Sequence, residues 1–265
     1  MTAAINTVST GTVQMDYVKF GSGRKSFVIL PGLSIHSVTR YADSIAESYK
    51  DFTAEYTVYL FDRAKNIREG YSIRDMAADT AAAMSELHIE NADVFGASQG
   101  GMMAQYLAID HPRLVRKMIL GSTLAKPNAV FNETVAEWAR LAEERNEPAL
   151  LESFAVRVYS LATLRQYKDA LMALNLNISE DEFKRFLILT NACKSFNCFA
   201  ELPAVHCPVL VIGAEGDRVT TAEGSRQIAD VLGCGLYLYD ANYGHGVFDE
   251  APDYKQRCLN FLEND

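Results

Sequence analysis

The segment Asp93–Gln105, DVFGASQGGMMAQ, changes its hydrophobic pattern at a serine. An apolar run typical of a buried strand ends at Ser98, and a helical pattern starts directly after it. Gly96 and Gly100 stand two positions either side of the serine, where a closely approaching strand and helix leave little room for side chains. This context predicts a nucleophile elbow, a strained turn that presents the serine hydroxyl at a strand end. A glycine-rich corner without a catalytic role would use the same residues. Whether the chain also supplies a base and an acid for Ser98 therefore distinguishes the two interpretations.

Residues 13–21 alternate as a short strand does, and apolar, β-branched runs recur after them, at residues 25–32, 56–62, 115–122, 207–217 and 235–241. Such runs suit strands that are buried on both faces, as in a parallel sheet. Helical patterns lie between them, and one of these begins at Ser72, which we expect to cap the helix with Asp75 in its first turn. The alternation of strand and helix predicts the α/β class with a mostly parallel sheet.

Residues 125–201 interrupt this alternation, because they contain helical patterns and no convincing strand. Pro148 is expected to start one of these helices, and Ser179 with Glu182 to form a capping box for another. We therefore expect a core made of residues 1–124 and 202–265, with a helical cap of residues 125–201. A cap inserted there would lie above the carboxyl ends of the strands, where open α/β sheets bind ligands.

A serine hydroxyl needs a base to become a nucleophile, and His245 is the best candidate. It follows the last strand between Gly244 and Gly246, as suits a loop residue that reaches across a pocket. Asp217, just after the preceding strand, is the expected orienting acid, with Glu215 as its competitor. The order Ser98, Asp217, His245 is the one that follows a nucleophile elbow, and Asp249 and Glu250 would break it.

The loop ILPGLSIHS, residues 29–37, is expected to complete an oxyanion hole. Its candidate donor is the backbone N–H of Leu33, and the second donor is the backbone N–H of Gln99. His36 in the same loop could contact a substrate, although a local structural role is favoured. Among the other histidines, His88 and His206 suit surface positions, and His111 suits the end of a helix.

These residues resemble the α/β-hydrolase superfamily in its capped serine-hydrolase form, similar to carboxylesterases and lactonases. The motifs are GASQGG, GAEGDRVT, YGHGVFDE, LPGLS and DHP, and the resemblance covers essentially the whole chain. It implies an eight-stranded, mostly parallel sheet flanked by helices, a Ser98–His245–Asp217 triad and no cofactor or metal. Two departures are Pro31-Gly32, where many relatives have His-Gly, and FDRAKNIREGYS, where many have closely spaced glycines. The second departure predicts a differently shaped loop after Asp62 and Arg63.

The chain carries a net charge of −9, which argues against nucleic acid as a partner. No stretch approaches the roughly 18 apolar residues of a membrane span, and the start lacks a signal-peptide pattern. Five cysteines without a CxxC pair are expected to be free thiols. We therefore expect a cytoplasmic protein without a membrane partner; the sequence does not indicate its oligomeric state.

The expected function is hydrolysis of a small-molecule ester, thioester or lactone through an acyl-enzyme on Ser98. The same residues would also serve a carbon–carbon bond hydrolase, a lyase-like synthase, or a receptor that turns its ligand over slowly. Apolar side chains of the cap either line a substrate pocket or pack the cap helices together: Phe131, Trp138, Phe154, Tyr159, Met172 and Phe196.

Overall fold

The computed structural model describes residues 3–11, 13–174 and 176–264, and within them eight strands form a single sheet. The expected core and cap ranges also include residues 1, 2, 12, 175 and 265, which lie outside the described part. The strands are β1 (Ala4–Thr10), β2 (Val13–Phe20), β3 (Lys25–Leu30), β4 (Tyr56–Ala64), β5 (Ala92–Ala97), β6 (Val115–Gly121), β7 (Val209–Ala214) and β8 (Gly235–Tyr239).

The strand order is β1-β2-β4-β3-β5-β6-β7-β8. β2 pairs antiparallel with β1 and β4, and the strands from β4 to β8 in this order run parallel. The predicted eight-stranded, mostly parallel α/β sheet is therefore confirmed. The apolar runs did not reveal β1, because Val8 is the one buried residue of this edge strand.

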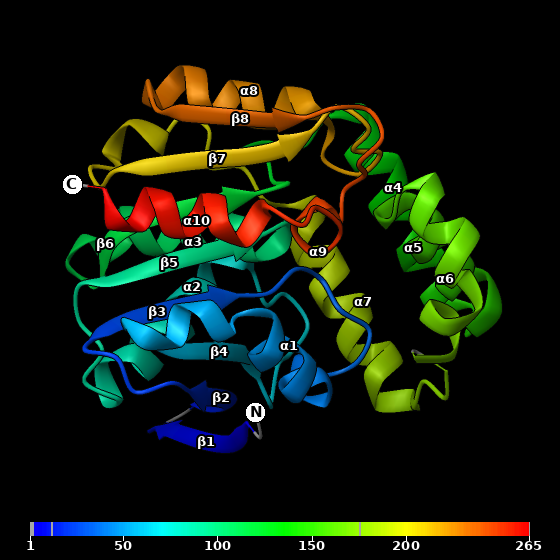
Figure 1. Ribbon diagram of the computed structural model, residues 1–265. Helices are drawn as coiled ribbons and strands as arrows, with labels where there is room; N and C mark the ends of the chain where they lie inside the picture. The colour runs from blue at the N-terminus through cyan, green and yellow to red at the C-terminus, as the bar shows by residue number, and fades with distance from the viewer. Residues whose placement is uncertain (1–2, 12, 175, 265) are drawn as a thin grey trace.

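Helices cover both faces of the sheet, and its inner strands are therefore apolar on both sides. Figure 1 shows α1 (Ala42–Ser48) and α10 (Tyr254–Glu263) in front, with α2 (Ile73–Glu86) and α3 (Gln99–Asp110) behind; α8 (Thr221–Leu232) packs on β7. In β3, Phe27 and Ile29 join one hydrophobic cluster, and Val28 and Leu30 join the other. Because neighbouring strand residues point to opposite faces, two buried faces produce a continuous apolar run.

The predicted helical insertion contains α4 (Ala129–Glu143), α5 (Glu147–Val158), α6 (Leu161–Leu174) and α7 (Glu180–Lys194). Figure 1 shows these helices beyond the arrowheads of β5, β7 and β8, at the carboxyl edge of the sheet. Pro148 lies in the first turn of α5, and Ser179 and Glu182 form a capping box at the start of α7, as predicted. The other predicted helix N-cap, Ser72 with Asp75 in the first turn, is also present, at the start of α2.

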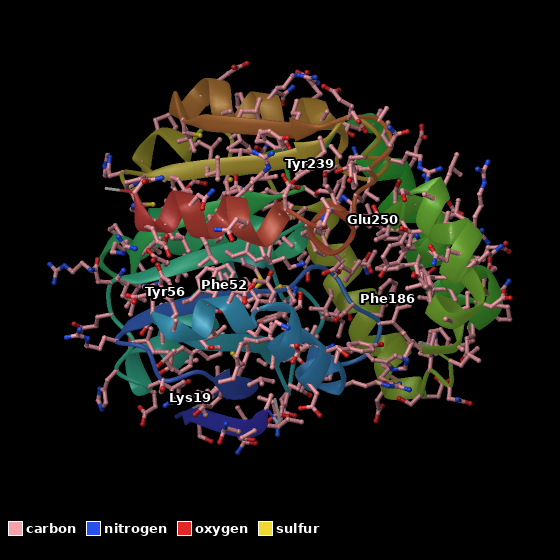
Figure 2. The ribbon with its side chains drawn as sticks, viewed as in Figure 1. Lys19, Phe52, Tyr56, Phe186, Tyr239 and Glu250 are labelled. Atoms are coloured by element: carbon pink, nitrogen blue, oxygen red, sulfur yellow. The ribbon has the colours of Figure 1, made fainter. Side chains whose placement is uncertain are left out.

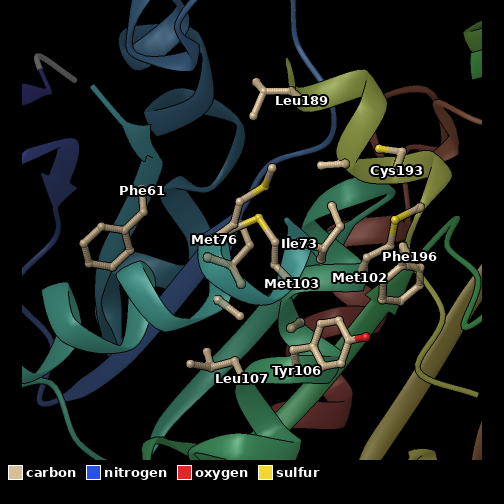
Figure 3. Close-up of a cluster of buried hydrophobic side chains, with 14 of the residues drawn as sticks. Phe61, Ile73, Met76, Met102, Met103, Tyr106, Leu107, Leu189, Cys193 and Phe196 are labelled. Atoms are coloured by element: carbon tan, nitrogen blue, oxygen red, sulfur yellow. The ribbon is translucent and has the colours of Figure 1, made fainter. Parts of the chain in front are cut away.

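The last cap helix is anchored on the core. Leu189 and Cys193 of α7, with Phe196 after it, pack in the same buried cluster as Met102 and Tyr106 of α3 (Figure 3). The cluster fixes the cap above the start of α3 through burial of apolar surface, the main stabilising force in folding.

Short elements connect these parts. They are α9 (Val247–Glu250) and the 3₁₀ helices Val38–Tyr41, Lys50–Ala54, Pro112–Leu114 and Leu202–Ala204. None of the helices in the described ranges is long and apolar enough to cross a membrane.

The glycines around Ser98 are required by close backbone packing. A Cβ atom on Gly100 would lie 1.9 Å from the carbonyl oxygen of Leu30, and one on Gly96 would lie 2.4 Å from that of Gly100. Backbone atoms cannot yield as a flexible side chain can, so α3 can begin this close to β3 and β5 only with glycine at both positions.

We predict that Gly100→Ala lowers the free energy of unfolding by about 3 kcal/mol or more, or prevents folding, because the added methyl group overpacks two backbones. Urea unfolding followed by circular dichroism measures the loss. Gly235→Ala is the control, since its Cβ would meet only the Leu210 methyl group at 3.3 Å. Equal stability of the two variants would contradict this account of the turn.

Candidate active site

Ser98 lies between β5 and α3 in a backbone conformation that is rare for residues other than glycine. Its φ is 53° and its ψ is −118°. The strain is held by hydrogen bonds on both sides: the Ser98 N–H donates to the carbonyl of Gly121 at 2.8 Å, and the Thr123 hydroxyl donates to the Ser98 carbonyl at 2.7 Å. The turn expected from the sequence therefore exists, and Ser98 is half-buried in it.

Three predicted residues meet in one hydrogen-bonded chain. The His245 Nε2 lies 2.9 Å from the Ser98 Oγ, and the His245 Nδ1 lies 2.9 Å from the Asp217 Oδ2. His245 and Asp217 are both buried. With its proton on Nδ1, the imidazole donates to Asp217 and accepts from the Ser98 hydroxyl, which is the arrangement that a general base for a serine requires.

Asp217 is held as a carboxylate at the end of β7. Its Oδ1 accepts from the N–H groups of Val219 at 2.7 Å and Thr220 at 3.0 Å, and its Oδ2 accepts from the Thr220 hydroxyl at 2.7 Å. Burial acts to raise the pKa of Asp217, but attraction to His245 and these hydrogen bonds outweigh it, so the pKa is below its usual value. The competitor Glu215 instead pairs with Arg226 at the surface.

The loop that carries His245 packs against the end of α5 in the cap. The Gly246 N–H donates to the Val158 carbonyl at 2.7 Å, and a Cβ on Gly244 would lie 3.0 Å from that same oxygen. Glu250 lies between sheet and cap in Figure 2 and accepts from the N–H groups of Ser160, at 2.8 Å, and Gly244, at 3.3 Å. The glycines beside His245 therefore permit contact with the cap, a role that the sequence did not indicate.

Both candidate oxyanion donors lie next to Ser98. Gln99 is the first residue of α3, where helix geometry leaves the backbone N–H without an intrahelical partner. Leu33 follows Gly32, whose Cβ position is 3.3 Å from the Ser98 Cβ. The Gln99 side chain adds contacts that sequence reasoning missed: its Nε2 donates to the Leu189 carbonyl at 2.9 Å and to the Cys193 Sγ at 3.0 Å, both in α7.

His36 links the candidate oxyanion loop to the cap. It is buried, and its Nδ1 lies 2.6 Å from the Glu182 Oε1 at the start of α7. Burial acts to raise the pKa of Glu182, but the hydrogen bonds from His36 and Ser179 lower it to about 2. His36 is thus held by the fold in a contact that also fixes the position of α7.

An apolar cavity of about 360 Å³ lies between the candidate oxyanion loop, α1, α5 and α6. Leu33 lines it, as do Phe154 and Tyr159, two of the cap aromatics predicted from the sequence. Tyr159 also adjoins the His245 loop, because the Cβ position of Gly246 is 3.4 Å from its ring. The cavity therefore reaches Leu33 of the candidate oxyanion loop, and Tyr159 in its wall contacts the residue after the candidate base; Ser98 and His245 are not among its described lining residues.

The other predicted cap residues pack elsewhere. Trp138 packs against Phe154 with ring centroids 4.6 Å apart, and Phe196 meets Tyr106 edge-on at 5.5 Å. Phe131 is buried in the main hydrophobic cluster, and Met172 is partly buried against it. All five cysteines are free thiols, and the described residues hold no group of three or more His, Cys, Asp or Glu side chains that could bind a metal ion.

Comparison with known proteins adds family evidence to this geometry. A family model described as the alpha/beta hydrolase fold matches residues 30–252. The 3-oxoadipate enol-lactonase 2 of Acinetobacter baylyi is 24% identical over 246 residues, 90% of this chain and 89% of that protein.

Solved structures give the same fold. MGS-M2, an alpha/beta hydrolase enzyme from a Medee basin deep-sea metagenome library, superposes with a TM-score of 0.87 at 20% identity, over 98% of both chains. The enol-lactonase from Burkholderia xenovorans LB400 superposes with a TM-score of 0.84 at 18% identity, over 98% of this chain and 100% of that one.

We predict that Glu182→Gln lowers the free energy of unfolding by about 1 kcal/mol at pH 7 through the weakened His36 contact. Glutamine can keep the capping box, so the change isolates the charge. A carboxylate with a depressed pKa stabilises the fold fully above its ordinary pKa of about 4.5 and loses this effect as the pH falls toward 2. The difference between native and variant protein should therefore shrink over that range in urea titrations.

The control for this experiment is Glu180→Gln. Glu180 lies in the same turn of α7 as Glu182, is exposed, and pairs with Arg145, which lies between α4 and α5. Its effect should stay below about 0.5 kcal/mol. A Glu182→Gln effect that is the same at pH 7 and pH 3 would contradict the assigned role of this contact.

Proposed function

The chain belongs to the alpha/beta hydrolase fold family, and on that premise we propose that it is a serine hydrolase acting on a small-molecule ester, thioester or lactone. The observation that carries the proposal is the hydrogen-bonded chain from Ser98 through His245 to Asp217, with 2.9 Å at both links. This chain is buried at its acid end and partly exposed at its serine, where a substrate can reach it.

The proposed reaction proceeds in two halves. The Ser98 Oγ attacks the substrate carbonyl carbon while the His245 Nε2 takes the hydroxyl proton, and Asp217 stabilises the imidazolium that forms. The backbone N–H groups of Leu33 and Gln99 bind the oxyanion, an effect worth about 3 kcal/mol per donor. His245 then gives its proton to the leaving oxygen or sulfur, which leaves an acyl group on Ser98. Water, deprotonated by His245, attacks this acyl group and restores the free serine.

The residues that line the cavity favour a neutral, apolar substrate. Among the described residues that line it, Asp249 carries the only formal charge. A carboxylate group on a substrate would therefore find no cation among these lining residues, and Asp249 itself pairs with Lys255, 3.6 Å away. A volume of 360 Å³ is about twice that of an engineered cavity that holds benzene, so a short alkyl chain or a ring fits. The enol-lactonase relative favours lactones among the candidate bonds, but the cavity favours one without a carboxylate.

We predict that Ser98→Ala keeps the fold and lowers kcat for p-nitrophenyl butyrate by about 10⁴-fold or more, because no other group can form the acyl-enzyme. A fluorophosphonate probe should label the native protein at Ser98 and leave this variant unlabelled. Ser195→Ala, which removes an exposed serine at the end of α7, is the control and should behave as native. Unchanged turnover in Ser98→Ala would refute the proposal, and a native protein that resists the probe would favour a ligand receptor.

We also predict that Phe154→Ala lowers kcat/KM for a hexanoyl ester by about tenfold and changes it little for an acetyl ester, because only the longer chain reaches this wall of the cavity. The control is Val156→Ala, an exposed residue on the same helix. The native enzyme should also prefer the hexanoyl ester to the matching mono-ester of adipic acid. A preference for the charged ester would contradict the assigned character of the cavity.

A further inference from the structure

Arg63 at the end of β4 contacts both segments that carry the candidate oxyanion donors. Its Nη2 donates to the carbonyl of Pro31 at 2.6 Å, to the carbonyl of Gly32 at 3.1 Å and to the Gln99 Oε1 at 2.7 Å. The guanidinium is buried, with 2% of the residue exposed. One cation therefore joins the loop after β3 to the first residue of α3.

The contact with Gly32 constrains the donor on Leu33. The carbonyl of Gly32 and the N–H of Leu33 belong to one planar peptide group, and in a trans peptide they point in opposite directions. A carbonyl held toward Arg63 therefore turns the Leu33 N–H away from Arg63. Leu33 lines the apolar cavity, and its neighbour Gly32 lies against Ser98. A cation on the carbonyl also polarises the peptide and makes its N–H a stronger donor.

The contact with Gln99 constrains the second donor. Both polar atoms of the Gln99 side-chain amide form hydrogen bonds. The oxygen accepts from Arg63, and the nitrogen donates to Leu189 and Cys193 in α7. A side chain fixed at three points leaves its own backbone little freedom. The Gln99 N–H is therefore held beside the strained peptide of Ser98, whose ψ of −118° sets its direction.

The charge around Arg63 is not balanced locally. Asp62 accepts from the backbone N–H of Arg63 at 2.7 Å and from the guanidinium of Arg185 at 2.6 Å. Its ion pair is therefore with Arg185, and the described residues form no ion pair with the Arg63 guanidinium. The Arg63 Nε and the Arg185 Nη1 are buried without a hydrogen-bond partner in the described part of the chain. Burial lowers the pKa of Arg63 to about 10, so it remains a cation at neutral pH. Keeping an incompletely paired cation buried is costly.

We infer that Arg63 is a positioning residue for the reaction proposed above: it orients the Gly32–Leu33 peptide and Gln99 so that both N–H groups are fixed in place before the oxyanion forms. The inference rests on the proposed function. It gives a role to Arg63, which stands near the start of FDRAKNIREGYS, the segment that lacks the closely spaced glycines of many relatives. Pre-organised donors stabilise the transition state because they do not have to reorient during the reaction.

Arg63→Lys tests this role, because lysine keeps the charge but its Nζ lies one bond closer to the backbone than the Arg63 Nη2, which makes all three contacts, and so falls short of the three oxygens. We expect kcat to fall about 100-fold with KM within threefold of native, since the loss affects the transition state alone. A trifluoromethyl ketone forms a bond to the Ser98 Oγ, its carbonyl oxygen becomes an oxyanion and the serine proton passes to His245. Its affinity should also fall about 100-fold, whereas that of the matching methyl ketone should stay within threefold.

Arg185→Lys is the matched control, because Arg185 contacts Asp62 and neither of the two loop carbonyls. It should leave kcat and both inhibitor affinities within threefold of native. If Arg63→Lys does not fold, Gln99→Met replaces it as the test variant. It removes the Arg63 contact with Gln99 at similar side-chain length, together with the two contacts of the Gln99 Nε2 with α7, and leaves both loop carbonyls bound to Arg63. This variant should lose about tenfold in kcat and in trifluoromethyl ketone affinity together.

A folded Arg63→Lys with native kcat, or one that loses affinity for both ketones equally, would overturn the inference and leave Arg63 a purely structural role. The same would follow from a folded Gln99→Met with native kcat and inhibitor affinity. These results are distinct from failure of the proposed function, which would appear as unchanged turnover in Ser98→Ala. An inactive Ser98→Ala beside a fully active Arg63→Lys would contradict the role of Arg63 alone.

Discussion

The strained backbone of Ser98 is the constraint on which the rest of this structure depends. A positive φ at a residue with a side chain costs free energy, which the surrounding contacts must supply. Here β6 fixes the Ser98 N–H and Thr123 fixes its carbonyl. The turn places α3 so close to β3 that the Cα of Gly100 has room for a hydrogen atom but not for a Cβ atom. The loop after β3, the start of α3 and the serine hydroxyl are thereby brought to one point at the carboxyl edge of the sheet.

The cap is joined to that point by polar contacts as well as by apolar burial. Glu182 and Leu189, both in α7, reach His36 and Gln99, and the Val158 carbonyl at the end of α5 binds the loop of His245. Each of these contacts involves a residue of the candidate site or its immediate neighbour. The cap therefore forms one wall of the apolar cavity and also holds the loops around Ser98 in position. A change at one of these contacts is expected to alter activity even where the changed residue does not touch a substrate.

The sequence predicted the features that depend on local pattern. Apolar runs marked the strands covered on both faces, and the order Ser98, Asp217, His245 brought together three residues that do meet. β1 was missed because an edge strand with one buried residue has no apolar run. The contacts of Arg63 and of the Gln99 side chain span 31 to 94 positions along the chain, and residue type alone cannot reveal such pairs. Likewise, periodicity does not tell which cap aromatics face a cavity, as Phe154 does, and which pack inward, as Trp138 does.

The central claim is that Ser98 becomes acylated during turnover. The most direct measurement is the intact mass of the native protein after acid quenching within milliseconds of mixing with an excess of p-nitrophenyl hexanoate, followed by peptide mapping. The account predicts a mass increase equal to one hexanoyl group, located in the peptide that contains Ser98 and lost as the substrate is consumed. Turnover without any acylated protein, or an acyl group located at another residue, would contradict it.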